Sequence, residues 1–402
     1  MLVLIIIGGS VLLSILGMVI LNSSPELAAQ GSDMLRGLIG DEAVSQLEST
    51  VFQVEDSLLQ WRYAHGIGTP TAPWQVTTIP ELSAGSATAE VPLPTVAPIP
   101  GSTSLRPVVN TTATPESSPG SGSWMPAHVT PLGSLEGEGV WSAYIQVASG
   151  QVVAYRTYLL PDPVRPYAIV GVIAFDLSQT RLHFVLGSNE PFAPNGPKRT
   201  GLMNAGDRAP GVLIAMFNGG FKARHGHFGA MAGGLVALPA RNGLGTLAIY
   251  QDGTLKLGEW GSEITATPDM AAWRQNGPLV IQAGQINPRI YNNAPQDWGY
   301  TVVDVSPTWR SGIGLSADGK TLYYICGSSL SMEMLAKSMQ AAGMFNAMQL
   351  DINNYWVHFV AVRSNANKLT MEPLFPAMMF ENIDRYLYAY SRDYFYVTLN
   401  TP

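Results

Sequence analysis

Short apolar runs bounded by polar turn residues dominate the chain from about residue 136 to its end. Runs rich in Val, Ile, Leu, Tyr and Phe are typical of β-strands. They read YAIVGVIAFDL (167–177), RLHFVLG (181–187), GVLIAMF (211–217), TLAIY (246–250), TLYYI (321–325) and YFYVTL (394–399). Asp-Gly separates apolar runs in YQDGTL (250–255) and SADGKTLYY (316–324). Each predicts a hairpin, because glycine accommodates the positive φ of a tight turn.

Apolar residues recur at helical spacing in two segments. In residues 41–62 they are Val44, Leu47, Val51, Val54, Leu58 and Trp61. In residues 331–343 the apolar face is Leu335, Ala336 and Met339, with Ser331 as N-cap and Gly343 as C-terminal stop. The second helix separates TLYYI from NAMQL (346–350), so these two strands are expected to be parallel and adjacent. The predicted fold is α+β, with a mixed, strongly twisted β-sheet core and a few packed helices.

The first 22 residues, MLVLIIIGGSVLLSILGMVILN, carry no charged side chain, and the first one in the chain is Glu26. About 20 apolar residues match the hydrocarbon core of a bilayer. A cleaved signal peptide usually has a basic n-region and a small-x-small cleavage site. No basic residue precedes this run, so we favour an uncleaved transmembrane signal anchor over a cleaved signal. The folded domain is then expected outside the cytoplasm.

Composition divides the rest of the chain. Residues 23–65 form a juxtamembrane helix region, in which helix 41–62 lies on a surface or pairs with a copy of itself. Residues 66–135 hold twelve of the 29 prolines among Ser, Thr, Gly and Ala. Such a stretch cannot bury enough apolar surface to offset its chain entropy, so a disordered, partly extended tether is expected. Residues 136–402 are the predicted folded domain.

Bulk properties exclude several functions. The 402 residues are 46% hydrophobic and 13% charged, with a formal net charge of -7, which gives no basic footprint for nucleic acid. The single cysteine, Cys326, rules out an intrachain disulfide framework and a multi-thiolate metal site. Its apolar surroundings predict a buried residue rather than a nucleophile. No cofactor is predicted; a divalent cation stays open, without a ligand motif behind it.

A first candidate site lies in IAMFNGGFKARHGHFGAMAGG (214–234), where a strand ends in a tight turn. Consecutive glycine N–H groups can form an anion-binding nest, and cations beside it suit a phosphate ester. The residues concerned are Asn218, Gly219, Gly220, Lys222, Arg224, His225 and His227. The plainer interpretations are an ordinary turn and, for the two histidines, surface residues or half of a metal site.

Further candidates precede or follow strands. WRQNG supplies Arg274, Gln275 and Asn276, and TWRSG supplies Arg310; each arginine could instead only hold a loop. In NAMQLDINNYWVHFVAV (346–362), Asp351 ends an apolar run, and Asn353 and Trp356 follow. The carboxyl end of a strand is where open α/β sheets present working groups. The alternative is that Asp351 only accepts hydrogen bonds that close its loop.

The order of FNGGF, TLAIYQDG, RSGIGLSADGKTLYYI, a helix and AMQLD resembles the phosphodiester glycosidase family (uncovering-enzyme-like domain) over residues 136–402. RQN, TWRSG and LDIN followed by Trp resemble a bacterial branch of it. Better-known members have a glycine-rich loop of the LDGGGSS type where this chain has LDIN. The resemblance implies a hydrolase of a sugar-1-phosphodiester or related anionic cell-envelope glycan such as an exopolysaccharide.

The resemblance also implies roles for the candidates. Asp351 would be nucleophile or general acid/base, and Arg274 and Arg310 would clamp the phosphate. The Asn218-Gly219-Gly220 turn would hold a phosphate or sugar oxygen, His225 or His227 would protonate the leaving oxygen, and Trp356 would stack on a sugar. The partner acid stays open between Asp304 and Asp297. The alternative function is a non-catalytic glycan-binding or structural envelope protein on the same fold.

Overall fold

The computed structural model describes residues 31, 34–76, 124–292, 295–298, 307–365, 368–379 and 382–400. The predicted anchor at 1–22 and the central part of the predicted tether lie outside these ranges. Within them, no helix is both long enough and apolar enough to cross a bilayer.

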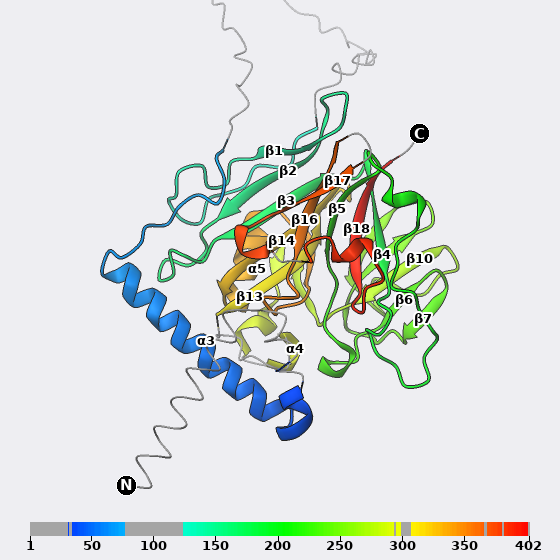
Figure 1. Ribbon diagram of the computed structural model, residues 1–402, viewed down its shortest axis with the longest axis horizontal. Helices are drawn as coiled ribbons and strands as arrows, with labels where there is room; N and C mark the ends of the chain where they lie inside the picture. The colour runs from blue at the N-terminus through cyan, green and yellow to red at the C-terminus, as the bar shows by residue number, and fades with distance from the viewer. Residues whose placement is uncertain are drawn as a thin grey trace, which may run out of the picture.

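Three antiparallel sheets make up the body of the protein (Figure 1). The eight-stranded sheet has the order β1 (Ser142–Gln146), β2 (Val152–Leu159), β3 (Val170–Asp176), β14 (Thr321–Leu330), β13 (Thr308–Leu315), β15 (Asn346–Gln349), β11 (Leu279–Gln282) and β12 (Gln285–Ile286). One five-stranded sheet is β17 (Lys368–Pro373), β16 (Phe359–Asn365), β5 (Leu213–Asn218), β18 (Tyr394–Leu399) and β4 (Thr180–Val185). The other is β7 (Leu235–Leu238), β6 (Ala230–Ala232), β10 (Met270–Gln275), β8 (Gly245–Tyr250) and β9 (Leu255–Glu259).

Helices are few among the described residues. The α-helices are α3 (Asp41–Ala64), α4 (Pro295–Trp298) and α5 (Met332–Ala341). Short 3₁₀ turns are η1 (Gly206–Arg208), η2 (Ala223–His225), η3 (Pro288–Asn292), η4 (Pro376–Met378) and η5 (Arg385–Leu387). The predicted helices correspond to α3 and α5, and the Ser331 side chain caps α5 by accepting from the Met334 N–H at 3.2 Å. The α+β class is confirmed.

The predicted strands and both Asp-Gly hairpins are present, since β8 pairs with β9 and β13 with β14. The expectation that the strands flanking α5 are adjacent is wrong. β13 lies between β14 and β15 and is antiparallel to both. β14 and β15 therefore run in the same direction without pairing, and the pairings between neighbouring strands are antiparallel rather than mixed. A strand–helix–strand connection usually joins adjacent parallel strands. Here β13, the hairpin partner of β14, pairs with the edge of β14 that β15 would otherwise occupy.

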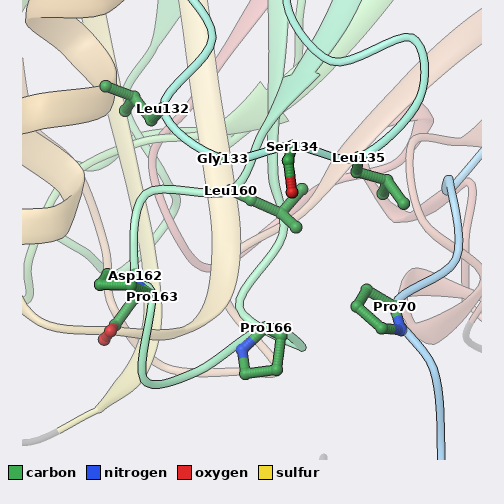
Figure 2. A pocket seen from close by; sticks show the side chains of 9 residues that line it. All are labelled: Pro70, Leu132, Gly133, Ser134, Leu135, Leu160, Asp162, Pro163 and Pro166. Carbon is green, nitrogen blue, oxygen red and sulfur yellow. The ribbon is translucent and has the colours of Figure 1, made fainter.

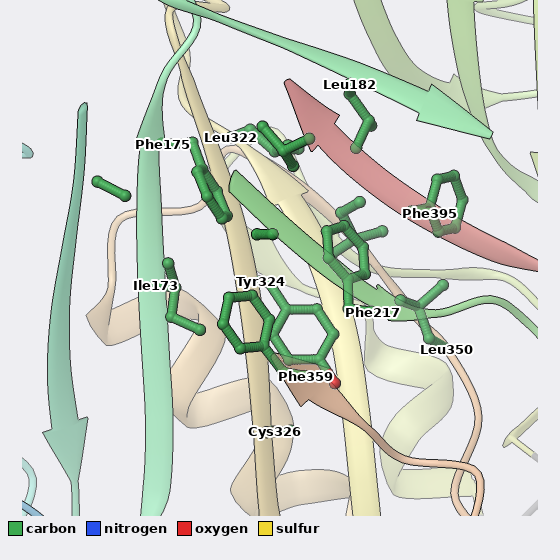
Figure 3. Close-up of a cluster of buried hydrophobic side chains, with 14 of the residues drawn as sticks. Ile173, Phe175, Leu182, Phe217, Leu322, Tyr324, Cys326, Leu350, Phe359 and Phe395 are labelled. Carbon is green, nitrogen blue, oxygen red and sulfur yellow. The ribbon is translucent and has the colours of Figure 1, made fainter. Parts of the chain in front are cut away.

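The core lies between the eight-stranded sheet and the sheet that contains β5. Figure 3 shows Phe175 and Tyr324 of the former facing Phe217, Phe359 and Phe395 of the latter. The ring centroids of Phe217 and Tyr324 are 4.7 Å apart. Each buried aromatic of this kind contributes about 1.5–3 kcal/mol through burial. Helix α5 covers the opposite face of the eight-stranded sheet and forms a second apolar cluster there.

Residues on both sides of residues 77–123 pack on the domain. Trp74 lies in the main core with the Arg156 guanidinium 4.6 Å from its ring centroid, and Val129 is buried in the second cluster. α3 lies along one side of the sheets (Figure 1), where Asp56 pairs with Arg165 at 2.7 Å. The packed unit thus includes residues on both sides that composition placed in the tether. The average composition of residues 66–135 is rich in proline and does not reveal that single large apolar side chains, such as Trp74, are buried in the core.

Candidate functional site

Strand ends from all three sheets meet at one place. Asn218 ends β5, Gln275 ends β10, Asp351 follows β15, and Asp393 directly precedes β18. The turn after β5 connects these segments: the Asp351 N–H donates to Gly219 O at 3.3 Å, and the Gly219 N–H donates to Asp393 O at 3.1 Å. The three sheets therefore bring together most of the residues that the sequence nominated, although they are far apart along the chain.

Asp351 is buried at the centre of this junction. Its Oδ1 accepts from the backbone N–H groups of Ile352 at 2.8 Å and Asn353 at 3.1 Å, and its Oδ2 forms an ion pair with Nη2 of Arg392. The Ser311 hydroxyl donates to the Asp351 carbonyl at 2.7 Å. The loop-closing role of this carboxylate is thus visible in the structure, and its catalytic role stays a prediction.

Arg392 is the principal site residue that the sequence did not nominate. Its Nη2 also donates to Gly220 O at 3.0 Å, and its guanidinium carbon lies 4.6 Å from the ring centroid of Trp356. Burial acts to lower the pKa of Arg392, but nearby carboxylates, led by Asp351, outweigh it and raise that pKa. The only signal in the sequence was a charged Arg-Asp pair before the last strand.

The N–H groups of the turn at Gly219 and Gly220 donate to acceptors within the protein itself, and the anion-binding nest stays a prediction. Gly220 donates its N–H to Asp393 Oδ2 at 3.1 Å, and the Phe221 N–H donates to Asn276 Oδ1 at 3.0 Å. Neither glycine is among the positive-φ residues, so a left-handed backbone is not the reason for glycine at these positions. A Cβ on Gly219 would instead collide with the Asp393 carboxylate. Close approach to Asp393 is therefore why this turn needs glycine.

Arg274 and Arg310 are both buried with their donors on protein acceptors. Arg274 Nε donates to Asp393 Oδ2 at 2.8 Å, and its Nη2 donates to Phe221 O at 2.6 Å. Arg310 Nε donates to Leu330 O at 2.8 Å. These contacts hold loops together, as the plainer interpretation had it. The phosphate clamp stays a prediction. Because both arginines are buried, little of either guanidinium group is exposed to a ligand.

The nominated amides brace the same junction. Asn218 Nδ2 donates to Ser311 Oγ at 3.0 Å, and its Oδ1 accepts from the Tyr324 hydroxyl at 2.8 Å. Asn276 Nδ2 donates to Gln349 O at 2.7 Å. Two further amides hold local structure, since the Gln275 side chain donates to Thr246 Oγ1 at 3.0 Å and Asn353 Oδ1 accepts from the Tyr355 N–H at 2.9 Å. These contacts fix the positions of Asp351 and its neighbours.

His225 sits among cations. Burial first, and then Arg224, Arg36, Arg392 and Lys222, lower its pKa to about 3. The imidazole is therefore neutral near pH 7 and has no imidazolium proton to give to a leaving group. The positive surroundings that keep it neutral also favour a bound anion.

Other nominated residues occupy different settings. His227 is exposed and has a φ of 49°. The Lys222 Nζ atom lies 5.5 Å from the Trp356 ring centroid. Asp297 forms an ion pair with Arg289 at 2.7 Å. Asp304 lies outside the described residues. In the part of the chain that the structure describes, no group of three or more His, Cys, Asp or Glu residues could hold a metal ion.

α3 reaches the edge of the site. Phe52 packs against Phe221, Phe228 and Ile352, which come from the turn after β5 and the loop after Asp351. Arg36, which precedes α3, forms an ion pair with Glu48 at 2.5 Å and contributes to the positive surroundings of His225. The N-terminal helix is thus part of the site's boundary.

A cavity of about 420 Å³ is formed by other residues, and Figure 2 shows the side chains that line it. It is lined by Pro70, Leu132, Gly133, Ser134, Leu135, Leu160, Asp162, Pro163 and Pro166. Its one carboxylate, Asp162, is paired with Arg165 at 2.9 Å. None of the candidate residues lines it, so this cavity offers no chemistry of the kind that the junction offers.

Comparison with known proteins bears on the same segment. The family model described as phosphodiester glycosidase matches residues 212–351. That stretch is therefore similar to the phosphodiester glycosidase family. It begins just before β5 and ends at Asp351, so it contains the turn, Arg274, Arg310 and the central carboxylate. The predicted resemblance is confirmed there, while Arg392 lies beyond the match.

Three solved structures are similar at low identity. The zebrafish N-acetylglucosamine-1-phosphodiester alpha-N-acetylglucosaminidase catalytic domain, auto-inhibited by its pro-peptide, has a TM-score of 0.40 and 14% identity, covering 64% of this chain and 86% of that one. A hypothetical protein from Synechocystis has a TM-score of 0.30 and 11% identity, with coverages of 58% and 59%. A Burkholderia pseudomallei protein has a TM-score of 0.28 and 11% identity, with coverages of 58% and 74%. Likenesses this distant carry no argument about chemistry. No curated protein sequence matches the chain.

Proposed function

We propose that this protein is a membrane-tethered, extracytoplasmic hydrolase of a sugar-1-phosphodiester or a related anionic cell-envelope glycan. The observation that carries the proposal is the Asp351–Arg392 ion pair at the end of the segment that matches the phosphodiester glycosidase family. It places a carboxylate and a cation at the point where three sheets meet. The tether and the location rest on the apolar run at residues 1–22.

In this reaction water cleaves the bond between the anomeric carbon and the phosphate oxygen. The water oxygen ends on the sugar, and the electron pair of the broken bond leaves with the phosphate. Asp351 acts at the anomeric carbon as nucleophile or as the base that takes a proton from water, and both roles require its negative charge. Backbone donors from Ile352 and Asn353 fix the carboxylate orientation.

The leaving group explains why one carboxylate is sufficient. A phosphate monoester has a second pKa of about 6, so it departs as an anion near neutral pH without taking a proton from the protein. A glycosidase that expels an alcohol needs a protonated acid for that step. The neutral state of His225 and the pairing of Asp297 with Arg289 are compatible with this requirement. Here a cation that holds the phosphate replaces the second acid.

One observation favours the second candidate, a non-catalytic glycan-binding protein. Both oxygens of Asp351 are engaged by the protein, Oδ1 by two backbone N–H groups and Oδ2 by Arg392. A carboxylate held in this way could serve as structure alone. The two candidates differ in whether the charge of Asp351 is needed for turnover.

The deciding experiment is hydrolysis of a panel of sugar-1-phosphodiesters by the full chain and by Asp351→Asn. A catalytic carboxylate supplies about 10²–10⁴-fold, so we expect turnover by the folded protein to fall at least about 100-fold. Asp176→Asn is the matched control, because Asp176 is also buried and its Oδ1 also accepts a backbone N–H, from Ser178 at 2.9 Å. Full turnover in a folded Asp351→Asn protein, or no hydrolysis of any panel member by wild type, would leave the binding protein as the better account.

A further inference from the structure

Arg392 holds unused donors in a buried position. Arginine has five N–H donors. The Nη2 atom uses its own on Gly220 O and Asp351, whereas Nε and Nη1 of Arg392 have no hydrogen-bond partner among the described residues. Its side chain is only 6% exposed. Leaving charged donors unpaired in such a place is costly, so they are best explained by a ligand that accepts from them.

The Arg392 guanidinium is held in place before any ligand arrives. It lies 4.6 Å from the ring centroid of Trp356, and cation–π contacts of this kind fix the plane of the group. Asp351 and Gly220 O hold one end of it. Arg274, the nominated arginine at the junction, has no such unpaired nitrogen. Its Nε, Nη1 and Nη2 atoms all donate, to Asp393 and to three backbone carbonyls.

The surroundings favour an anion. Lys222 lies over the same indole, with Nζ 5.5 Å from the Trp356 ring centroid. Burial is the main cause of the low pKa of His225, and Arg224, Arg36, Arg392 and Lys222 lower that pKa further. Positive charge is thus present at this junction, while the nearby carboxylates of Asp351 and Asp393 are paired with arginines and that of Glu190 accepts backbone N–H groups.

We propose that Nε and Nη1 of Arg392 bind the phosphate group of the substrate, beside Asp351. The identity of the ligand as a phosphodiester rests on the proposed function, while the anion site itself does not. Arg392 is then the recognition residue that sets the anomeric carbon next to the carboxylate, and Arg274 shapes the turn behind it.

The test is titration of inorganic phosphate into the full chain by calorimetry, which needs no turnover. Arginine and lysine differ in donor number and geometry, so Arg392→Lys should weaken phosphate binding at least about tenfold. Asp351→Asn should tighten it at least about threefold, because a like charge beside the anion is removed. Arg156→Lys is the matched control and should bind as wild type does, since Arg156 also stacks on an indole (Trp74, 4.6 Å) and pairs with a carboxylate (Glu372, 3.4 Å) away from the site.

Equal phosphate affinity in wild type and a folded Arg392→Lys protein would overturn the assignment. If Arg392→Lys does not fold, the Asp351→Asn titration decides: tighter binding supports the site, and unchanged or weaker binding refutes it. Failure to hydrolyse any phosphodiester, with phosphate binding that still depends on Arg392, would refute the hydrolase and leave the anion site standing. Hydrolysis of a phosphodiester by wild type, with phosphate binding that does not depend on Arg392, would refute the anion site and leave the hydrolase standing.

Discussion

Asp393→Asn tests whether the junction depends on a buried ion pair. The Asp393 Oδ2 atom accepts from Arg274 Nε at 2.8 Å and from the Gly220 N–H at 3.1 Å, and the side chains of Asp393 and Arg274 are both 0% exposed. Asparagine keeps the shape and one acceptor but leaves the Arg274 charge without a counter-ion. Removing one partner of a buried pair costs about 3–5 kcal/mol, because the remaining charge is uncompensated.

The measurement is urea unfolding of the full chain, followed by tryptophan fluorescence, with a thermal scan beside it. A loss of that size lowers the melting temperature by roughly 6–20 °C for a domain of this scale. Asp176→Asn is the control, because that buried carboxylate accepts from the neutral Ser178 N–H at 2.9 Å and hydroxyl at 2.7 Å. Its expected cost is about 1 kcal/mol. A cost for Asp393→Asn no larger than that of the control would refute the reasoning from buried charge.

Two further outcomes are expected away from the junction. Burial lowers the pKa of His183 to about 4, against the opposing effect of Asp207, so the unfolded chain binds a proton first as pH falls. The stability that His183 contributes is complete above about pH 6.5 and is lost as the pH falls towards 4, with a loss of about 2 kcal/mol at pH 5. In His183→Gln, the free energy of unfolding should therefore fall less steeply with decreasing pH than in wild type. Leu58 and Trp61 are 56% and 54% exposed on α3. If the chain self-associates through residues 41–62, Leu58→Ser should lower the molar mass measured by light scattering. Its free energy of unfolding should stay within about 0.5 kcal/mol of wild type, because the side chain is exposed.

A pH profile of stability that is identical in wild type and His183→Gln would show that this histidine is not buried neutral. For α3, an unchanged molar mass in Leu58→Ser would exclude the exposed stripe as the contact between copies. A wild-type protein that is monomeric from the start would exclude it equally well.

The sequence predicted those features that depend on neighbouring residues. Strand runs such as 394–399, the Asp-Gly hairpins and the Ser331 cap all follow from local pattern and turn chemistry. It also singled out Asp351, because a lone acid after an apolar run interrupts the pattern. The Arg392–Asp351 pair joins residues 41 positions apart and depends on which strands meet. No local rule contains that information, and a single charged residue before a strand resembles many others.

The order of the sheet was beyond local rules for the same reason. β13 enters between β14 and β15 because it pairs with both, and only the complete set of pairings decides this. The turn after β5 shows a related limit: its consecutive glycines correctly indicated a tight turn, but not which groups accept from its N–H donors. Which anion fills that turn depended on Asp393, some 170 residues later, whose Oδ2 accepts from Gly220 across a separation of 173.

The docking of α3 changes how far the domain could stand from a membrane. Asp56 holds the helix to Arg165 and Tyr167, and Phe52 holds it to the edge of the site, so α3 and the sheets form one body. The residues on both sides of 77–123 also pack on this body, so that segment does not separate α3 from the sheets. If residues 1–22 are the anchor, the height of the site above the lipid is set by the short stretch before α3 and by the 24-residue helix itself, about 36 Å long. Adding residues between positions 77 and 123 would then leave the height of the domain unchanged, whereas inserting residues before Asp41 would raise it.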